Sequence, residues 1–171
     1  MVEAAALLAG RPGIKFVMAG DGPSKQSLIS LADSRGVTNL RFEDTVPRPL
    51  VASILASCDA AVVPLAAELP GTMPSKVYEA IASGVPLVVT RGCEAESLVN
   101  EHGVGRVFAP LDAEDLSSII ADMAECSEGL KDMSERCRKL SEQFDLDRIA
   151  CHAEAVLIAV SEGRPLPDLR R

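Results

Sequence analysis

The sequence has no tryptophan, one tyrosine and four phenylalanines among 171 residues, and its formal net charge is −8. Proteins that bind single-stranded nucleic acid stack the bases on aromatic side chains, and non-specific binding to the phosphate backbone requires an excess of lysine and arginine. We therefore expect no nucleic-acid partner. The acidity is interpreted as a solvated surface that keeps the protein in solution.

Metal-binding and disulfide patterns are also missing. The five cysteines include no Cys-x-x-Cys pair, and His102 and His152 have no further metal ligand at a suitable spacing. We therefore predict no metal site, and no Ser-His-Asp or Cys-His arrangement can be identified. Three cysteines lie among apolar residues and are predicted to be buried, namely Cys58, Cys137 and Cys151. Free thiols fit a reducing compartment, and the cytoplasm is the predicted location.

Short apolar runs rich in β-branched residues alternate with amphipathic segments. Such nearly continuous apolar runs are typical of buried parallel strands. The predicted strands are Lys15–Ala19, Asn39–Phe42, Ala60–Pro64, Pro86–Thr90 and Gly105–Phe108. This order predicts an α/β fold with a Rossmann-like doubly wound parallel sheet of about five strands flanked by helices.

The two ends of the chain depart from this alternation. After the last predicted strand only helical patterns follow, and residues 164–171, with two prolines, are predicted to be a frayed tail. Val2–Gly10 has the pattern of the second half of a helix with no strand before it. We therefore predict one domain over residues 1–163 that is truncated at its amino end. The missing strand is expected to leave a gap or an exposed edge in the sheet, which invites pairing with another chain.

The most informative segment is Gly71–Pro86, where a glycine-bearing loop enters a short helix. Pro74 suits the first helical position, and Ser75 and Lys76 then lie in the first turn, where free N–H groups and the helix dipole favour an anion. Glu79 shares their helix face, so a carboxylate that could accept hydrogen bonds from sugar hydroxyls lies one turn from a phosphate site. This is the chemistry of binding a nucleotide diphosphate sugar. A simple surface ion pair between Lys76 and Glu79 is the alternative.

Two further motifs lie at predicted strand ends, where such sheets bind ligands. Phe16–Pro23 is a strand that ends in Gly-Asp-Gly-Pro, and glycines there allow close approach of a ligand to the backbone. It is not a dinucleotide fingerprint, because Lys25 occupies the position of the third glycine. Asp44-Thr45-Val46 follows the next strand, and its backbone could face a nucleobase. A tight turn and a proline-stiffened loop remain the alternatives for the two motifs.

In this order the motifs resemble the C-terminal, donor-binding domain of the GT-B glycosyltransferases, in particular the retaining group 1 family. The resemblance spans nearly the whole chain and rests on Val17–Pro23, Leu40–Val46, Cys58–Pro64 and Pro74–Pro86. Within the last of these, Tyr78–Pro86 is similar to the family signature Glu-Ala-Met-Ala-x-Gly-x-Pro.

The resemblance implies roles for the matching residues. Glu79 would bind the donor ribose, Lys76 and Ser75 would lie near the diphosphate, and Lys76 and Glu79 would be the catalytic pair. The other donor contacts would come from Gly71, Thr72 and Met73 beside the sugar, from Gly20 and Gly22 along the cleft, and from Thr45 and Val46 beside the base. The family transfers the sugar with retention of configuration. It needs neither a structural metal nor an organic cofactor.

The sequence departs from the family pattern in two respects. The first of the family's paired glutamates falls at Gly71, and Glu68 is out of register. The family's first strand of this domain, its Gly-Arg…Lys-Gly phosphate contacts and its N-terminal acceptor domain have no counterpart here. The expectation is a piece of a transferase for bacterial surface polysaccharide that binds its donor but is inactive alone.

Several alternatives stay open at this point. A nucleotide-sugar epimerase of the same architecture should carry acid and base groups in the cleft, and a non-catalytic nucleotide-binding domain should bind the nucleotide without transferring a sugar. The expected partners are the nucleotide-sugar donor and the missing acceptor domain. Peripheral membrane contact through the parent protein and self-association through an exposed sheet edge are further alternatives.

Overall fold

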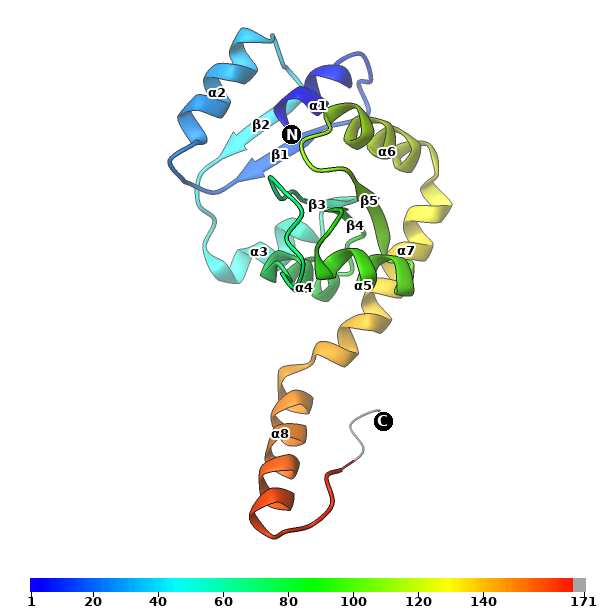
Figure 1. Cartoon of the computed structure of the whole chain (residues 1–171). Helices are drawn as coiled ribbons and strands as arrows, with labels where there is room; N and C mark the ends of the chain where they lie inside the picture. Colours follow the sequence, from blue (N-terminus) through cyan, green and yellow to red (C-terminus); the bar gives the residue numbers. More distant parts are fainter. Residues whose placement is uncertain (168–171) are drawn as a thin grey trace.

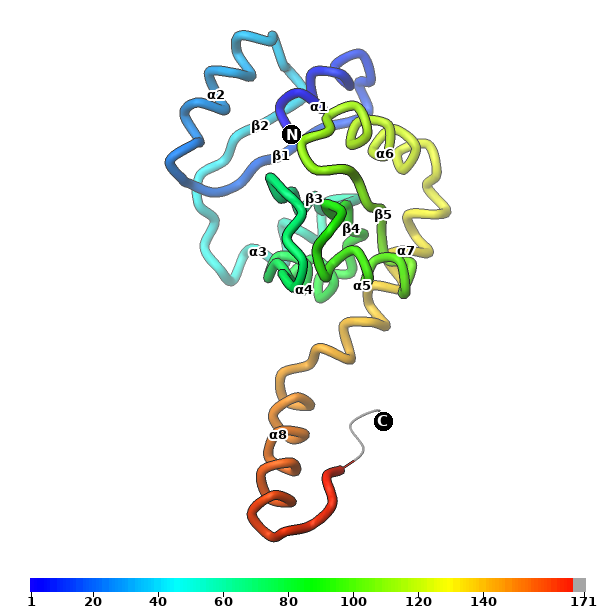
Figure 2. The backbone as a smooth tube through the Cα atoms, viewed as in Figure 1, coloured from blue at the N-terminus to red at the C-terminus, as the bar shows by residue number. Residues whose placement is uncertain are grey.

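The computed structural model describes residues 1–167 and shows five parallel strands that alternate with helices (Figures 1 and 2). The strands are β1 (Phe16–Ala19), β2 (Leu40–Glu43), β3 (Ala61–Val63), β4 (Leu87–Thr90) and β5 (Gly105–Phe108). The helices are α1 (Val2–Leu7), α2 (Lys25–Ser34), α3 (Arg48–Leu55), α4 (Ser75–Ala82), α5 (Glu94–His102), α6 (Ala113–Glu125), α7 (Ser127–Ser141), the short η1 (Glu142–Phe144) and α8 (Leu146–Ser161). The predicted α/β class and all five predicted strands are confirmed.

The strands form two parallel sheets instead of the single sheet that the sequence predicts. One sheet pairs β1 with β2, and the other has the order β3-β4-β5, with β4 in the centre. Among the described residues, no strand pairs with the second edge of β1 or with that of β3. The outer edges of β2 and β5 are likewise unpaired among the described residues, so the unpaired edge that the sequence predicts is present on four strands.

The direction of the peptide groups shows which residues of β1 and β3 have N–H and C=O groups on the unpaired edges. In a parallel strand, alternate residues direct their N–H and C=O groups to opposite edges. The N–H of Phe16 donates to the residue that precedes β2, and the N–H of Ala61 donates to the residue that precedes β4, both at 2.8 Å. The peptide groups of Val17 and Val62 consequently face the unpaired edges. The side chain of Val17 is also 50% exposed, so β1 is open at its face as well as its edge.

Strand β4 is buried on both faces by helices. Leu87 and Val89 belong to a cluster that includes apolar residues of α4, α5 and α7, whereas Val88 belongs to a second cluster with residues of α1 and α6. Continuous apolar sequence in β4 follows directly from this arrangement, since neither face meets water.

Helix α1 connects the two sheets where strand pairing does not. Ala4 packs in the cluster that contains Val88 of β4, while the adjacent Ala5 packs in the cluster that contains Phe16 of β1. The buried side chain of Asn39, which precedes β2, donates from Nδ2 to the carbonyl oxygen of Ala5 at 3.0 Å. The relative position of the two sheets therefore depends on the packing of this short helix.

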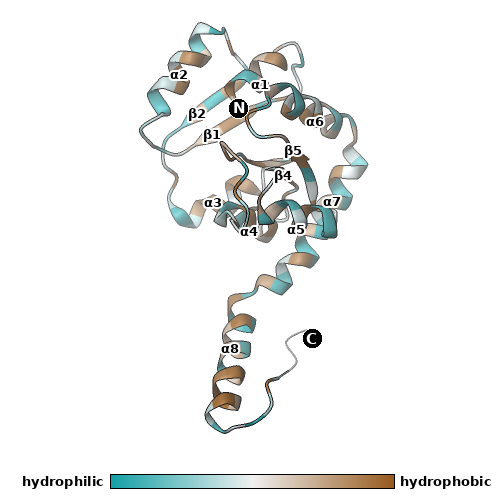
Figure 3. Cartoon of the chain, in the orientation of Figure 1, coloured by the Kyte–Doolittle hydropathy of each residue, from teal (hydrophilic) through white to brown (hydrophobic). Residues whose placement is uncertain are grey.

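Helix α8 extends away from the rest of the molecule (Figure 1). Apolar side chains along it remain largely in solvent, with Leu146 80% and Leu157 70% exposed, as the hydropathy colours also show (Figure 3). Over residues 1–167, no helix combines the length and the apolar character needed to cross a membrane. Of the predicted frayed tail, residues 164–167 form neither helix nor strand, and residues 168–171 lie outside the described part.

The five cysteines are all free, as predicted, but not all of those predicted to be buried are. Cys137 of α7 is buried, and this burial raises the pKa of its thiol to about 11. Cys58 is half-buried. The prediction for Cys151 is wrong, because α8 does not pack against the sheets and leaves this thiol exposed.

Strands β4 and β5 lie so close together at Gly105 that a side chain there would collide with the backbone of β4. A Cβ atom added there would lie 2.0 Å from the backbone oxygen of Leu87, whereas one added at Gly10 would meet no atom within 4 Å. We predict that Gly105→Ala lowers the free energy of unfolding by at least about 2 kcal/mol, because the two strands must separate. Urea denaturation would measure this loss, with Gly10→Ala as the control that stays within about 0.5 kcal/mol of the original. Equal stability of both variants would contradict this view of the sheet.

Candidate functional site

The predicted site residues form two groups, each at the carboxyl end of a different sheet. One group lies on the loop after β3 and on the first turns of α4, and includes Lys76 and Glu79. The other lies on the turn after β1 and the loop after β2, and includes Gly20 and Thr45. Both groups therefore follow the carboxyl ends of parallel strands, where such folds bind ligands.

Helix α4 begins one residue later than predicted. Pro74 is the N-cap, with φ −65° and ψ 129°, and the helix starts at Ser75 instead of at the proline. The extended ψ of Pro74 turns the loop sharply into the helix. No side chain caps this end, and the first turn contains no acidic residue. The amino end of α4 therefore retains free N–H groups and its positive partial charge.

The amino end of α5 differs from that of α4. Its first turn contains Glu94 and Glu96, and Glu96 Oε2 accepts a hydrogen bond from the N–H of Gly92 at 2.7 Å. The N–H of Glu94 donates to the carbonyl oxygen of Thr72 at 3.0 Å. Because carboxylates and a carbonyl already occupy this helix end, α4 is the better anion site of the two.

Lys76 and Glu79 contact each other in this structure. The ammonium Nζ lies 2.9 Å from Oε1 and 3.0 Å from Oε2, and the two side chains are 68% and 38% exposed. The surface ion pair that the sequence left as the alternative is therefore formed. Such a pair three residues apart on an exposed helix contributes only about 0.2–0.5 kcal/mol. Either side chain can thus exchange its partner for a ligand at little cost.

The loop between β3 and α4 is held to the end of β4. The N–H of Leu65 donates to the buried hydroxyl Oγ1 of Thr90 at 2.7 Å, and the bond from Glu94 to Thr72 fixes the far side of the loop. Met73 packs against the core, and Gly71 has a positive φ of 77°. The predicted sugar-facing residues 71–73 are therefore positioned by the start of α5 and by the core, and Gly71 adopts a conformation that favours glycine.

Glu68 lies on the same loop, and its side chain rests on Gly92. A Cβ atom at Gly92 would come within 2.5 Å of it. The Glu68 side chain therefore lies against the connection between β4 and α5.

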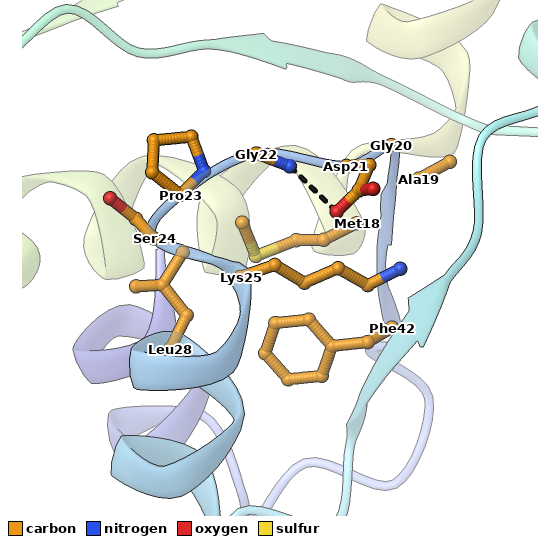
Figure 4. A pocket seen from close by; sticks show the side chains of 10 residues that line it. All are labelled: Met18, Ala19, Gly20, Asp21, Gly22, Pro23, Ser24, Lys25, Leu28 and Phe42. Carbon is orange, nitrogen blue, oxygen red and sulfur yellow. Dashed lines mark hydrogen bonds between the residues drawn. The ribbon is translucent and has the colours of Figure 1, made fainter.

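The second group surrounds a pocket of about 260 Å³ beside the Gly-Asp-Gly-Pro turn (Figure 4). Gly20 and Gly22 line it, and Asp21 Oδ1 accepts a hydrogen bond from the N–H of Gly22 at 2.8 Å, which tightens the turn. Met18, Leu28 and Phe42 supply its apolar surface. Neither Thr45 nor Val46 belongs to the pocket lining.

Lys25 is not among the residues predicted for the site, yet it joins the two parts of the second group. Its Nζ donates to the carbonyl oxygen of Glu43 at 3.0 Å and to Asp44 Oδ1 at 2.7 Å. The hydrogen bond from Lys25 lowers the pKa of the Asp44 carboxyl. A lysine two residues after a Gly-Asp-Gly-Pro turn, together with an acidic pair at the end of the next strand, is the sequence signal that could have identified this contact.

The pocket beside the Gly-Asp-Gly-Pro turn does not extend to the first group of site residues. The residues that line the pocket come from β1, the following turn, α2 and β2, and none comes from α4. His102 closes α5 and His152 lies on α8, so neither histidine lies at the carboxyl end of a strand. Within the described residues, no group of three or more His, Cys, Asp or Glu side chains could hold a metal ion.

The chain is similar to known glycosyltransferases in sequence and in structure. A probable glycosyltransferase, WbjE of Pseudomonas aeruginosa, is 30% identical over 113 residues, which is 64% of this chain and 28% of WbjE. HepE of Anabaena, solved with UDP and glucose, superposes with a TM-score of 0.78 at 19% identity over 92% of this chain and 44% of HepE. The catalytic domain of the Helicobacter pylori cholesterol-α-glucosyltransferase superposes with a TM-score of 0.71 at 23% identity over 84% of this chain and 87% of that domain.

The structural similarities confirm the Rossmann-like fold expected for a GT-B domain. The chain covers only a minor part of the length of WbjE and of HepE. The sequence profile of the family described as glycosyl transferases group 1 matches residues 1–140, which are most of the chain. The resemblance inferred from the four sequence motifs is therefore correct, and the chain belongs to the group 1 glycosyl transferases.

Proposed function

We propose that this chain binds the nucleotide diphosphate part of a sugar donor for a retaining glycosyltransferase of bacterial surface polysaccharide. One observation carries the proposal. An uncapped helix start without acidic residues presents Lys76 and Glu79 on one face, beside a loop fixed to the central strand. The presence of UDP in the HepE structure and the family membership support it.

In this proposal the phosphates bind at the start of α4. The free N–H groups of Ser75 and Lys76 and the lysine ammonium face the diphosphate, while Glu79, one turn further, accepts hydrogen bonds from the ribose hydroxyls. Lys76 leaves Glu79 when the diphosphate arrives, which the weak ion pair permits. The same positive groups then stabilise the charge that develops on the leaving diphosphate, and neither a metal nor an organic cofactor is required.

The remaining donor contacts are assigned to backbone groups. Amides of Gly71, Thr72 and Met73 face the sugar, Gly20 and Gly22 allow close approach at the cleft, and Thr45 and Val46 face the base. With these assignments, the complete donor site includes residues from both sheets.

The acceptor half of the reaction is assigned to polypeptide outside this sequence. WbjE and HepE both extend well beyond the matched region, which supports such a division. Contact with a membrane would then occur through that parent protein. The five free cysteines favour a reducing compartment such as the cytoplasm.

Glu79→Ala tests the donor site directly. Ligand that binds only the folded state at about 100 times its dissociation constant stabilises by roughly 2.7 kcal/mol, so UDP should raise the melting temperature of the chain. We predict that Glu79→Ala abolishes this shift, because the ribose loses its acceptor. Glu135→Ala, on the exposed face of α7, is the control that retains it. An unchanged shift in Glu79→Ala would rule out the assigned ribose contact.

The isolated chain should bind a donor without transferring its sugar. We predict that incubation with UDP-glucose and a glycan acceptor releases no UDP above the uncatalysed rate, since no acceptor-binding half is present. A coupled assay for UDP measures this, and sustained release by the purified chain would contradict the division between donor and acceptor halves.

The unpaired edges of β1 and β3 are proposed to make the chain associate with itself. Free N–H and C=O groups on a strand edge pair readily with another chain, and a lysine on the edge prevents this. We predict oligomers at high protein concentration in sizing chromatography with light scattering. Val17→Lys should shift the population toward monomer, whereas Gln26→Lys, which adds the same charge on α2, should not. A concentration-independent monomer would exclude this association.

A further inference from the structure

A single ammonium group links the turn after β1 to the loop after β2. Lys25 is the first residue of α2, directly behind the Gly-Asp-Gly-Pro turn, whereas Glu43 ends β2 and Asp44 begins the next loop. The two hydrogen bonds from Nζ, at 3.0 and 2.7 Å, therefore join segments 18 and 19 residues apart. Lys25 itself lines the pocket shown in Figure 4.

The aliphatic part of Lys25 is held within the pocket. The side chain is only 21% exposed, and it lies along the ring of Phe42 and near Met18 (Figure 4). Lys25 is thus better buried than Arg11, which is 50% exposed in its pair with Glu125, although the carboxylate of Asp44 is fully exposed. Because the stem of Lys25 is already packed, its ammonium group has less rotational freedom to lose when it binds the loop.

The loop that Lys25 holds is short and carries unused polar groups. It runs from Asp44 to Pro47, between the end of β2 and the start of α3. Over the described residues, no hydrogen bond joins the peptide groups of Thr45 or Val46 to another part of the chain. These N–H and C=O groups are therefore available to a ligand, and the contact with Asp44 is the restraint closest to them.

We propose that Lys25 is a positioning residue that fixes the loop after β2, so that the peptide groups of Thr45 and Val46 recognise the nucleobase of the donor. This inference rests on the proposed donor function and deepens it. Lys25 is not assigned to the phosphates, because its ammonium also donates to the backbone carbonyl of Glu43 and its side chain is only 21% exposed, whereas Lys76 pairs with Glu79 alone and is 68% exposed. Base recognition should therefore depend on Lys25, and phosphate binding at α4 should not.

Calorimetric titration of the full chain with UDP and, separately, with pyrophosphate separates these two roles. We expect Lys25→Met to weaken UDP binding about tenfold or more and to leave pyrophosphate binding within about twofold, as misplaced polar groups lose hydrogen bonds to the base. Lys25→Arg should restore most of the UDP affinity. Arg11→Met removes an ion pair far from the site with the same change of charge, and should alter neither affinity. A general loss of stability would weaken both ligands alike, and that result would overturn the proposal.

Amide hydrogen exchange of the ligand-free chain gives a second, independent measurement. Lys25→Met should accelerate exchange several-fold at Gly20 and Leu50, whose N–H groups donate to the carbonyl oxygens of Glu43 and Pro47 at the two ends of the loop, and leave Val77 of α4 unchanged. Unchanged exchange at Gly20 and Leu50 would overturn the role of Lys25. If the original chain bound neither UDP nor pyrophosphate, the proposed donor function would be wrong, and the exchange data alone would decide whether Lys25 fixes the loop.

Discussion

The candidate site depends on the burial of strand β4 between two layers of helices. Leu87, Val88 and Thr90 are each completely buried. A buried hydroxyl must find a hydrogen-bond partner, and that of Thr90 accepts the N–H of Leu65 from the loop after β3. The same loop leads through Thr72 and Pro74 into α4. The packing of the core thus determines where the amino end of α4, with its lysine and glutamate, faces solvent.

The strands that carry the candidate site belong to two separate sheets. The β1–β2 sheet carries the glycine turn and the loop of Thr45, and the β3–β5 sheet carries α4. Packing of both α1 and α6 relates the two sheets, since each helix has residues in the core clusters of both, and among the described residues no backbone ladder joins the sheets. A nucleotide bound by both groups of site residues would itself link the two sheets. Local contacts such as that of Lys25 therefore matter more here than in a continuous sheet.

The sequence predicts the features that arise from neighbouring residues. The five strands follow from apolar runs, and the shared face of Lys76 and Glu79 follows from their spacing of three. The separation into two sheets could not be predicted in this way, because it depends on hydrogen bonds between strands that are distant in sequence. The contact of Lys25 with Asp44 has the same origin. The exposure of Cys151 depends on whether α8 packs on the sheets, which its helical pattern alone does not determine.

The projection of α8 has a thermodynamic consequence. Helix α8 packs chiefly against η1, and many of its apolar side chains are exposed to water. Burial of apolar surface therefore contributes little to the stability of this helix. A helix of this length is only marginally stable without tertiary packing. We therefore expect the helix–coil equilibrium of α8 to be only weakly coupled to the cooperative unfolding of residues 1–144, so that α8 loses its helical structure at a lower temperature than the core.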